Sequence, residues 1–143
     1  MTRVFLFPDY IAYLEDAIKF ENSYKPIIKE FGDYLARKGF DENDVKYFTE
    51  CSYKFIGYVC LISESRKLEQ LTKAQVSSKY IRFLNKGIPP LKNRMGKIIS
   101  YQFEHSKQLK AFFIFLHLHK NCTNVVVLRA FCDKEELKQL GIK

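Results

Sequence analysis

Hydrophobic residues recur at helical spacing along most of the chain, and this pattern predicts an all-α protein of about five helices. The first two predicted helices are short and cover Asp9–Phe20 and residues 23–38. The third runs from residue 41 to residue 62, the fourth covers residues 72–86, and the fifth covers residues 91–120. Only six glycines and four prolines are present, which favours long helices over a turn-rich β-protein.

The residues at the expected helix ends have side chains suited to those positions. Ser23 is predicted to cap the second helix, with Pro26 in the first turn, where its missing N–H costs little. Gly39, preceded by two cations, is typical of a helix stop. Thr72 and Gln75 match the capping box, in which each side chain binds a free backbone N–H at the start of a helix.

The two ends of the chain are less regular. Residues 3–7 predict a short strand or an arm. Residues 125–131 are rich in β-branched side chains, so they predict a short strand or an extended tail. A last short helix is expected to start at Asp133 and to end near Leu140. With 143 residues, the chain is expected to form a single domain, in which residues 121–143 are a tail.

Positive charge is concentrated in the second half of the chain, whose formal net charge is +8. Residues 1–69 hold ten basic and twelve acidic side chains, whereas residues 70–132 hold eleven basic side chains and one acid, Glu104. Residues 133–143 hold three of each. A one-sided excess of this kind favours a polyanionic partner, most often nucleic acid, although lysine-rich faces are also common as solvated surface.

Residues 70–103 contain no acid at all. This acid-free segment predicts a surface for double-stranded DNA on two helices that are joined by a turn at residues 89–90. Arg82 and Arg94 are the candidates for reading base edges, because a planar guanidinium can pair with guanine. Tyr80 and Tyr101 are the aromatic residues most suited to stacking on bases. The predicted nucleic-acid-binding residues are Lys73, Lys79, Arg82, Lys86, Lys92, Arg94, Lys97, Lys107 and Lys110.

Other chemistry finds little support in the sequence. A zinc site is not expected, because helical neighbours two residues apart point to different faces and the spacing of the four potential ligands matches no common finger: His117, His119, Cys122 and Cys132. A cysteine could pair with His105 for nucleophilic catalysis, but no local motif supports the pair. Glycine-rich phosphate-binding loops are absent from the sequence. We therefore expect no enzymatic activity, no metal and no cofactor.

The sequence contains no apolar run of eighteen residues, and its first residues lack a signal-peptide pattern. The four cysteines form no C-x-x-C pair, and two of them fall in an apolar helical pattern. These features predict a cytoplasmic protein with reduced cysteines and no membrane contact.

Three stretches give the chain a resemblance to a known family. Residues 24–35 (YKPIIKEFGDYL), residues 71–84 with their threonine cap, and residues 95–116 with their Phe-rich end resemble the core-binding, SAM-like domain of phage integrases, which are tyrosine recombinases. Residues 133–137 look like the opening of the catalytic domain that would follow. The resemblance covers residues 22–120.

This resemblance implies a DNA-clamping module without strand-cleaving chemistry. The family's catalytic constellation of Arg, His-x-x-Arg and Tyr has no counterpart in this sequence, and the helix predicted at residues 41–62 is unusually long. The chain would then be an integrase fragment, or a phage or mobile-element regulator. The alternative is a small helical interaction factor that docks an acidic protein and uses residues 125–131 as an added strand or anchor.

Overall fold

A computed structural model of the chain describes residues 7–62, 67–86 and 88–142. The protein is all-α, as predicted, with one small two-stranded sheet among the described residues. The chain divides into two compact units, Met1–Arg66 and Lys67–Lys143, each of which is described by itself. The prediction of a single domain is not tested by this division.

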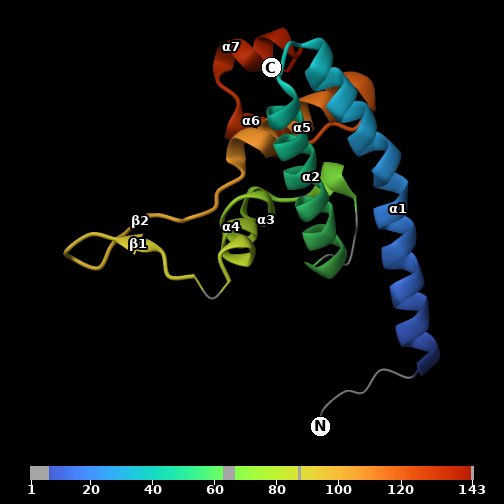
Figure 1. Ribbon diagram of the computed structural model, residues 1–143, viewed down its shortest axis with the longest axis horizontal. Coiled ribbons are helices and arrows are strands. Elements are labelled where there is room, and N and C mark those ends of the chain that lie inside the picture. Colours follow the sequence, from blue (N-terminus) through green and yellow to red (C-terminus); the bar gives the residue numbers. More distant parts are fainter. Residues whose placement is uncertain (1–6, 63–66, 87, 143) are drawn as a thin grey trace. The chain divides into compact units, whose positions relative to one another are not determined.

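The first unit is a pair of helices, α1 (Phe7–Arg37) and α2 (Glu42–Ile62), which pack along each other (Figure 1). The helix α1 ends as predicted: Gly39 has a φ of +94°, and the Phe40 N–H donates to the Leu35 carbonyl at 3.1 Å. Asp41 then accepts a hydrogen bond from the Asp44 N–H at 2.8 Å and so caps α2. The core includes Ile28, Phe31, Leu35, Phe55, Ile56 and Val59.

The two short helices predicted for residues 9–38 are one continuous helix. Ser23 is not a cap, because its hydroxyl donates to the Phe20 carbonyl at 2.6 Å within α1. Pro26 therefore lies inside the helix, where it removes one backbone donor. Its side of the helix is exposed, so water can satisfy the carbonyl left without a partner. The prediction was wrong because the apolar stripe of Tyr24, Ile28 and Phe31 continues without a break across the Ser-Pro segment.

The second unit is made of short elements (Figure 1). In chain order they are a 3₁₀ turn η1 (Leu68–Gln70), α3 (Lys73–Val76), α4 (Ser78–Leu84), β1 (Leu91–Lys92), β2 (Ile98–Ser100), α5 (Ser106–His119), α6 (Val125–Phe131) and α7 (Lys134–Gln139). Its most buried apolar side chains come from the segment between η1 and α6: Leu68, Leu71, Val76, Tyr80, Leu109, Phe112, Phe113, Phe115, Leu116, Val127 and Leu128. Of these elements α5 has the most buried residues, although Leu118 near its end is exposed.

The helix predicted at residues 72–86 begins with the expected capping box between Thr72 and Gln75. It is nevertheless divided into α3 and α4 at Ser77, whose backbone is not helical (φ −115°, ψ −92°) and whose hydroxyl donates to the Lys73 carbonyl at 2.6 Å. A serine hydroxyl that bonds to the carbonyl four residues earlier offers the backbone an alternative to regular helical hydrogen bonds, and the helix is interrupted at this point.

The long helix predicted at residues 91–120 is wrong in its first half. Residues 91–100 form an antiparallel β-hairpin, in which Leu91 lies opposite Ser100 and Lys92 lies opposite Ile98, and α5 begins only at Ser106. The β-branched pair at residues 98–99 and the glycine at residue 96 favour a strand and a turn over a helix.

The strand predicted at residues 125–131 is also wrong, because this segment is the helix α6. The Asn124 side chain accepts a hydrogen bond from the Val127 N–H at 3.1 Å and caps the helix. Val127 and Leu128 are fully buried, so this local cap and tertiary burial override the β-propensity of the valines. The last predicted helix is confirmed as α7, which starts with a capping box between Asp133 and Glu136. The arm or strand predicted at residues 3–7 falls almost entirely outside the described residues, and its last residue begins α1.

Candidate nucleic-acid interface

The hairpin is attached to the second unit by one buried side chain, Asn85, at the end of α4. Its Nδ2 donates to the carbonyls of Ile81 (2.8 Å) and Phe103 (2.7 Å), and its Oδ1 accepts from the Phe103 N–H (3.0 Å). Asn85 thus bonds both backbone groups of Phe103 as a neighbouring strand would. It joins the two ends of the segment that carries the hairpin. We call this segment, residues 88–102, the arm.

The tip of the arm is an ordered turn. Asn93 accepts from the Met95 N–H (2.9 Å) and the Lys97 N–H (3.0 Å) through its side-chain Oδ1. Its backbone carbonyl accepts from the Gly96 N–H (3.0 Å), and its own N–H donates to the Lys97 carbonyl (2.9 Å). Gly96 has a φ of +78°, which a residue with a Cβ rarely adopts. These contacts are typical of a type I turn followed by a left-handed residue, a common hairpin loop.

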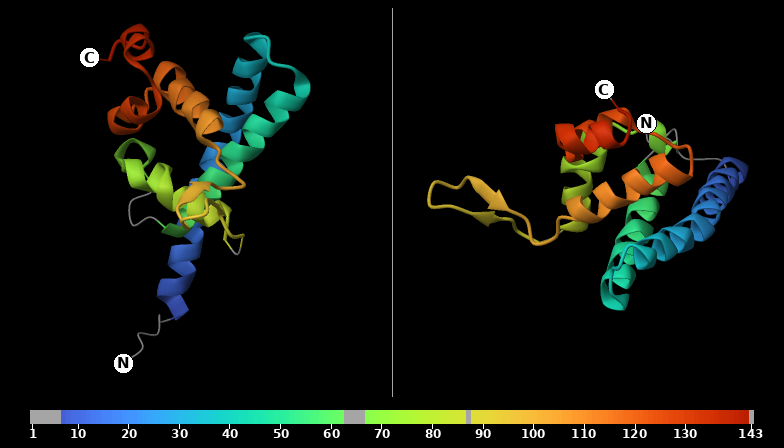
Figure 2. Two further views of the ribbon diagram at one scale, coloured as in Figure 1. Left: turned by 90° about the vertical axis from the view of Figure 1, so that its left-hand side faces the viewer. Right: turned by 90° about the horizontal axis from the view of Figure 1, so that it is seen from above.

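The arm extends away from the helices of its own unit (Figure 1; Figure 2, right). Every residue from Leu91 to Ile99 is exposed. Three of the predicted binding residues lie on it: Lys92 in β1, and Arg94 and Lys97 in the turn. The arm contains no acidic residue, so no carboxylate on it offsets the charge of these cations.

A second group of predicted cations lies where the arm begins. Lys79 and Arg82 are exposed residues of α4 at a spacing of three, which places them on the same side of the helix. Lys86 is exposed directly after Asn85. Phe83 is 39% exposed on the same helix, so α4 presents an aromatic ring beside its cations. We call these three cations together with Lys92, Arg94 and Lys97 the basic surface.

The other three predicted cations do not belong to the basic surface. Lys73 is exposed on α3 and Lys107 is exposed in the first turn of α5. Lys110 forms an ion pair with Glu136, with 2.6 Å between Nζ and Oε2. The hydrogen bond between them raises the pKa of Lys110 and lowers the pKa of the Glu136 carboxyl. The charge of Lys110 is thus balanced inside the unit, and this residue is a poor candidate for a phosphate contact.

One of the two tyrosines predicted to stack on bases is unsuited to that role. Tyr80 is fully buried, and its hydroxyl lies 3.1 Å from Nδ1 of the buried His105. Tyr101 is partly exposed at the end of the arm. Sequence reasoning missed two exposed side chains, Phe83 and Met95, because it assigned both segments to amphipathic helices. The Asn-Arg-Met-Gly turn sequence before two β-branched residues could have identified the hairpin.

The histidines and cysteines considered for metal or nucleophilic chemistry have structural contacts. His117 Nδ1 lies 2.7 Å from the Thr123 hydroxyl and its Nε2 lies 2.8 Å from the Leu140 carbonyl, so this side chain links α5 to the end of α7. Burial raises the pKa of Cys51 and of Cys122 to about 11, which leaves both thiols protonated at neutral pH. Among the residues that the structure describes, no three His, Cys, Asp or Glu side chains are grouped to hold a metal ion.

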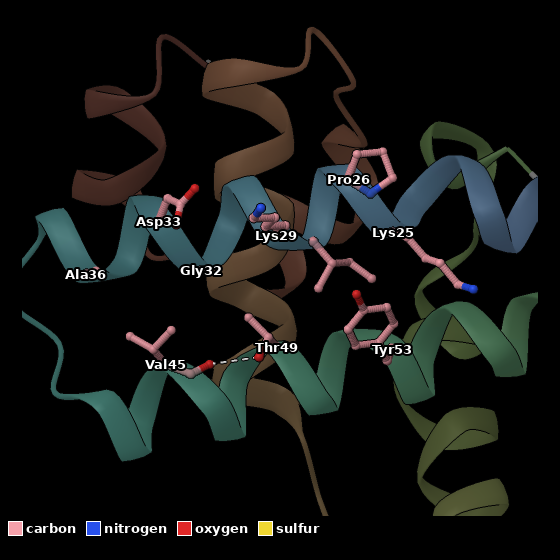
Figure 3. A pocket seen from close by; sticks show the side chains of 10 residues that line it. Lys25, Pro26, Lys29, Gly32, Asp33, Ala36, Val45, Thr49 and Tyr53 are labelled. Carbon is pink, nitrogen blue, oxygen red and sulfur yellow. Dashed lines mark hydrogen bonds between the residues drawn. The ribbon is translucent and has the colours of Figure 1, made fainter.

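An open groove of about 600 Å³ lies between α1 and α2 in the first unit (Figure 3). Gly32 allows the two helices to approach here, because a Cβ at this position would lie 3.2 Å from Cγ2 of Thr49. The polar lining combines Lys25 and Lys29 with Asp33, so no single charge dominates. The groove contains none of the predicted site residues.

Comparison with known proteins gives no match: no family model, no curated protein and no solved structure is similar to this chain. The resemblance to integrase core-binding domains therefore stays a prediction. Within residues 7–62, 67–86 and 88–142, no helix is both long enough and apolar enough to cross a membrane.

The clamp formed by Asn85 can be tested by Asn85→Ala. This change removes three part-buried hydrogen bonds and leaves both backbone groups of Phe103 without the side chain that holds them, so we expect a loss of about 1–3 kcal/mol in the free energy of unfolding. Amide hydrogens of residues 91–100 should also exchange faster, because the arm loses its fixed base. Urea unfolding and hydrogen exchange measure the two effects. The exposed Asn43→Ala is the matched control, and an Asn85→Ala protein that behaves like it would contradict the role of the clamp.

Proposed function

We propose that residues 67–143 bind double-stranded DNA through the basic surface. The observation that carries this proposal is the projecting arm, whose residues 91–99 are all exposed and present Lys92, Arg94 and Lys97 with no acid among them. Nothing in the packing of the unit explains such a projection, since none of the residues 91–99 is buried. An exposed loop on a rigid base is a common position for a binding element.

The mechanism follows from the shape and charge of the arm. A two-stranded ribbon is narrow enough to enter a groove of B-DNA, and the cations of its first strand and of its turn can then reach the phosphates that border the groove. Lys79 and Lys86, at the base of the arm, extend the contact along the backbone. Each phosphate that is neutralised releases counterions, which makes the affinity strongly dependent on salt. Arg82 and Arg94 have the planar donor groups that can also read base edges.

We test this proposal by measuring duplex affinity at several salt concentrations. With about six phosphate contacts, the log–log slope should be near −5, so affinity should fall about a thousandfold between 50 and 200 mM salt. The triple change Lys92→Ala, Arg94→Ala and Lys97→Ala should reduce the slope to about −2.5, so the same change in salt should weaken binding only about thirtyfold. Fluorescence anisotropy with a labelled 20-base-pair duplex measures both slopes.

The first unit supplies a matched control with the same change in charge, namely Lys25→Ala, Lys46→Ala and Lys54→Ala, three exposed lysines on α1 and α2. This variant should bind like the unmodified protein, because acidic residues already balance the charge of that half. Equal losses from the two triple variants would show a nonspecific polycation. Absence of duplex binding at 50 mM salt would refute the proposal.

On this proposal the chain is a binding module and not a catalyst. If the resemblance to integrase core-binding domains holds, it acts in DNA recombination as an integrase fragment or as a phage or mobile-element regulator. A protein partner is the second candidate, favoured by the exposed Val125 and Val126 on α6. Because this segment is helical, it would dock by a helix face and not by adding a strand. Failure of duplex binding would favour this reading.

A further inference from the structure

We infer that the arm inserts Met95 between two base pairs from the minor groove and thereby kinks the duplex. This inference rests on the proposed DNA binding and adds a mode of contact to it. Met95 stands at the apex of the turn, and its side chain is 92% exposed. It is the most exposed of the large hydrophobic side chains among the described residues.

The turn fixes the backbone that carries this side chain. The backbone N–H of Met95 donates to Oδ1 of Asn93, and the same oxygen accepts from the Lys97 N–H, so Asn93 fixes both sides of the apex. The Gly96 N–H closes the turn on the Asn93 carbonyl. Because the backbone is ordered before binding, insertion of the thioether costs less conformational entropy than it would from a loose loop.

An apolar side chain at this position has no structural use within the unit. Turn apices are normally occupied by Gly, Asn, Asp, Ser or Pro, each of which suits the backbone or the solvent. Met95 buries almost nothing, and Leu91, Ile98 and Ile99 are also exposed along the arm. Several exposed apolar side chains among cations on one short arm indicate a contact with another molecule.

Charge selects DNA as that molecule. Arg94 precedes Met95 in the turn, Lys92 ends the strand before the turn, and Lys97 is the last residue before β2. Minor-groove proteins that bend DNA combine an apolar wedge, which unstacks a base step, with cations that contact the phosphates beside it. An arginine is attracted by the negative potential of a narrow minor groove. A second copy of this chain is disfavoured as the partner, because the cations of two paired arms would repel each other.

The experiment compares an intact 20-base-pair duplex with the same duplex carrying a two-nucleotide bulge. A wedge must unstack the intact duplex, whereas the bulge is already unstacked and kinked, so the unmodified protein should bind the bulged duplex about tenfold more tightly. Met95→Ser should bind both duplexes with nearly equal affinity and should keep the salt slope, because no charge has changed. Fluorescence energy transfer between the duplex ends should increase with the unmodified protein and not with Met95→Ser.

Two further variants complete the design. Met95→Leu keeps an apolar wedge and should retain the preference for the bulged duplex and the bend. Leu118→Ser removes an exposed apolar side chain from α5, away from the arm, and should change neither property. Met95 is exposed, so Met95→Ser should melt like the unmodified protein.

The outcomes separate this inference from the proposed function. If Met95→Ser keeps the preference for the bulge and the bend, or if it loses the same factor on both duplexes, the wedge is refuted while DNA binding stands. If the unmodified protein binds neither duplex at 50 mM salt, the proposed function itself fails. Binding of the unmodified protein to phosphatidylserine vesicles, lost in Met95→Ser and unaccompanied by duplex binding, would assign the arm to an anionic membrane surface and overturn both.

Discussion

Replacing Phe112 with alanine is expected to lower the free energy of unfolding of the second unit by about 3–5 kcal/mol, the usual cost for a buried phenylalanine. Phe112 lies in α5, and its side chain has no exposed surface. Its ring meets the ring of Phe113 edge to face, with 6.2 Å between centroids. The substitution removes this contact and leaves a cavity that the close-packed neighbours fill only in part.

Urea unfolding followed by circular dichroism measures this loss. Leu118→Ala on the same helix is the control, because Leu118 is 47% exposed and its truncation should cost only about 0.5 kcal/mol. If the two variants unfold at the same urea concentration, α5 is not the core helix of the unit.

The sequence predicts well the elements whose apolar spacing and end chemistry agree. The helix α2 has two acids, Glu42 and Asp44, in its first turn and a continuous buried face, and its two ends were predicted to within a residue. The capping boxes at Thr72 and Asp133 were also confirmed, because they depend only on residues three positions apart.

Errors arose where a local feature and a longer pattern disagree. Ser23 and Pro26 favour a helix start, but the apolar stripe of α1 continues past them and burial decides the outcome. The valines before Phe131 favour a strand, yet Asn124 caps a helix there. In residues 91–100 the spacing of apolar residues was interpreted as helical, although the turn residues of this segment specify a hairpin.

The candidate site was predictable in composition but not in geometry. Charge counts located the acid-free segment, and they placed Lys92, Arg94 and Lys97 in it correctly. Counts cannot show that these residues stand on an exposed arm, or that Lys110 is paired with Glu136, because both facts depend on contacts between residues far apart in the sequence. The clamp between Asn85 and Phe103 is equally invisible without the fold.

The second large effect is expected at Asn124, which is 2% exposed and bonds three backbone groups. Its Nδ2 donates to the carbonyls of Leu68 (2.8 Å) and Leu71 (2.9 Å), while its Oδ1 accepts from the Val127 N–H. One side chain therefore both caps α6 and attaches it to the segment around η1. Asn124→Ala should cost about 2–3 kcal/mol, since it removes three buried hydrogen bonds at once.

Asn124→Asp should cost more, about 3–5 kcal/mol at neutral pH, although it is nearly isosteric. The new carboxyl keeps the cap of α6, but it turns a negative oxygen towards two carbonyl oxygens in a buried site. Burial and this repulsion raise the pKa of the new carboxyl in the folded state above its value in the unfolded chain. The unfolded state therefore releases its proton at a lower pH than the folded state does.

The sign of the pH dependence follows from this difference. As pH rises above the unfolded pKa, the folded state of Asn124→Asp holds a proton that the unfolded state has lost, so stability falls with pH. As pH decreases from 7 towards 4, the deficit of Asn124→Asp relative to the unmodified protein should shrink, because the protonated carboxyl can donate to one of the two carbonyls. Urea unfolding at several pH values measures the trend, with the exposed Asn22→Asp as the control. A deficit that is independent of pH would show that Asn124 does not donate to buried carbonyls.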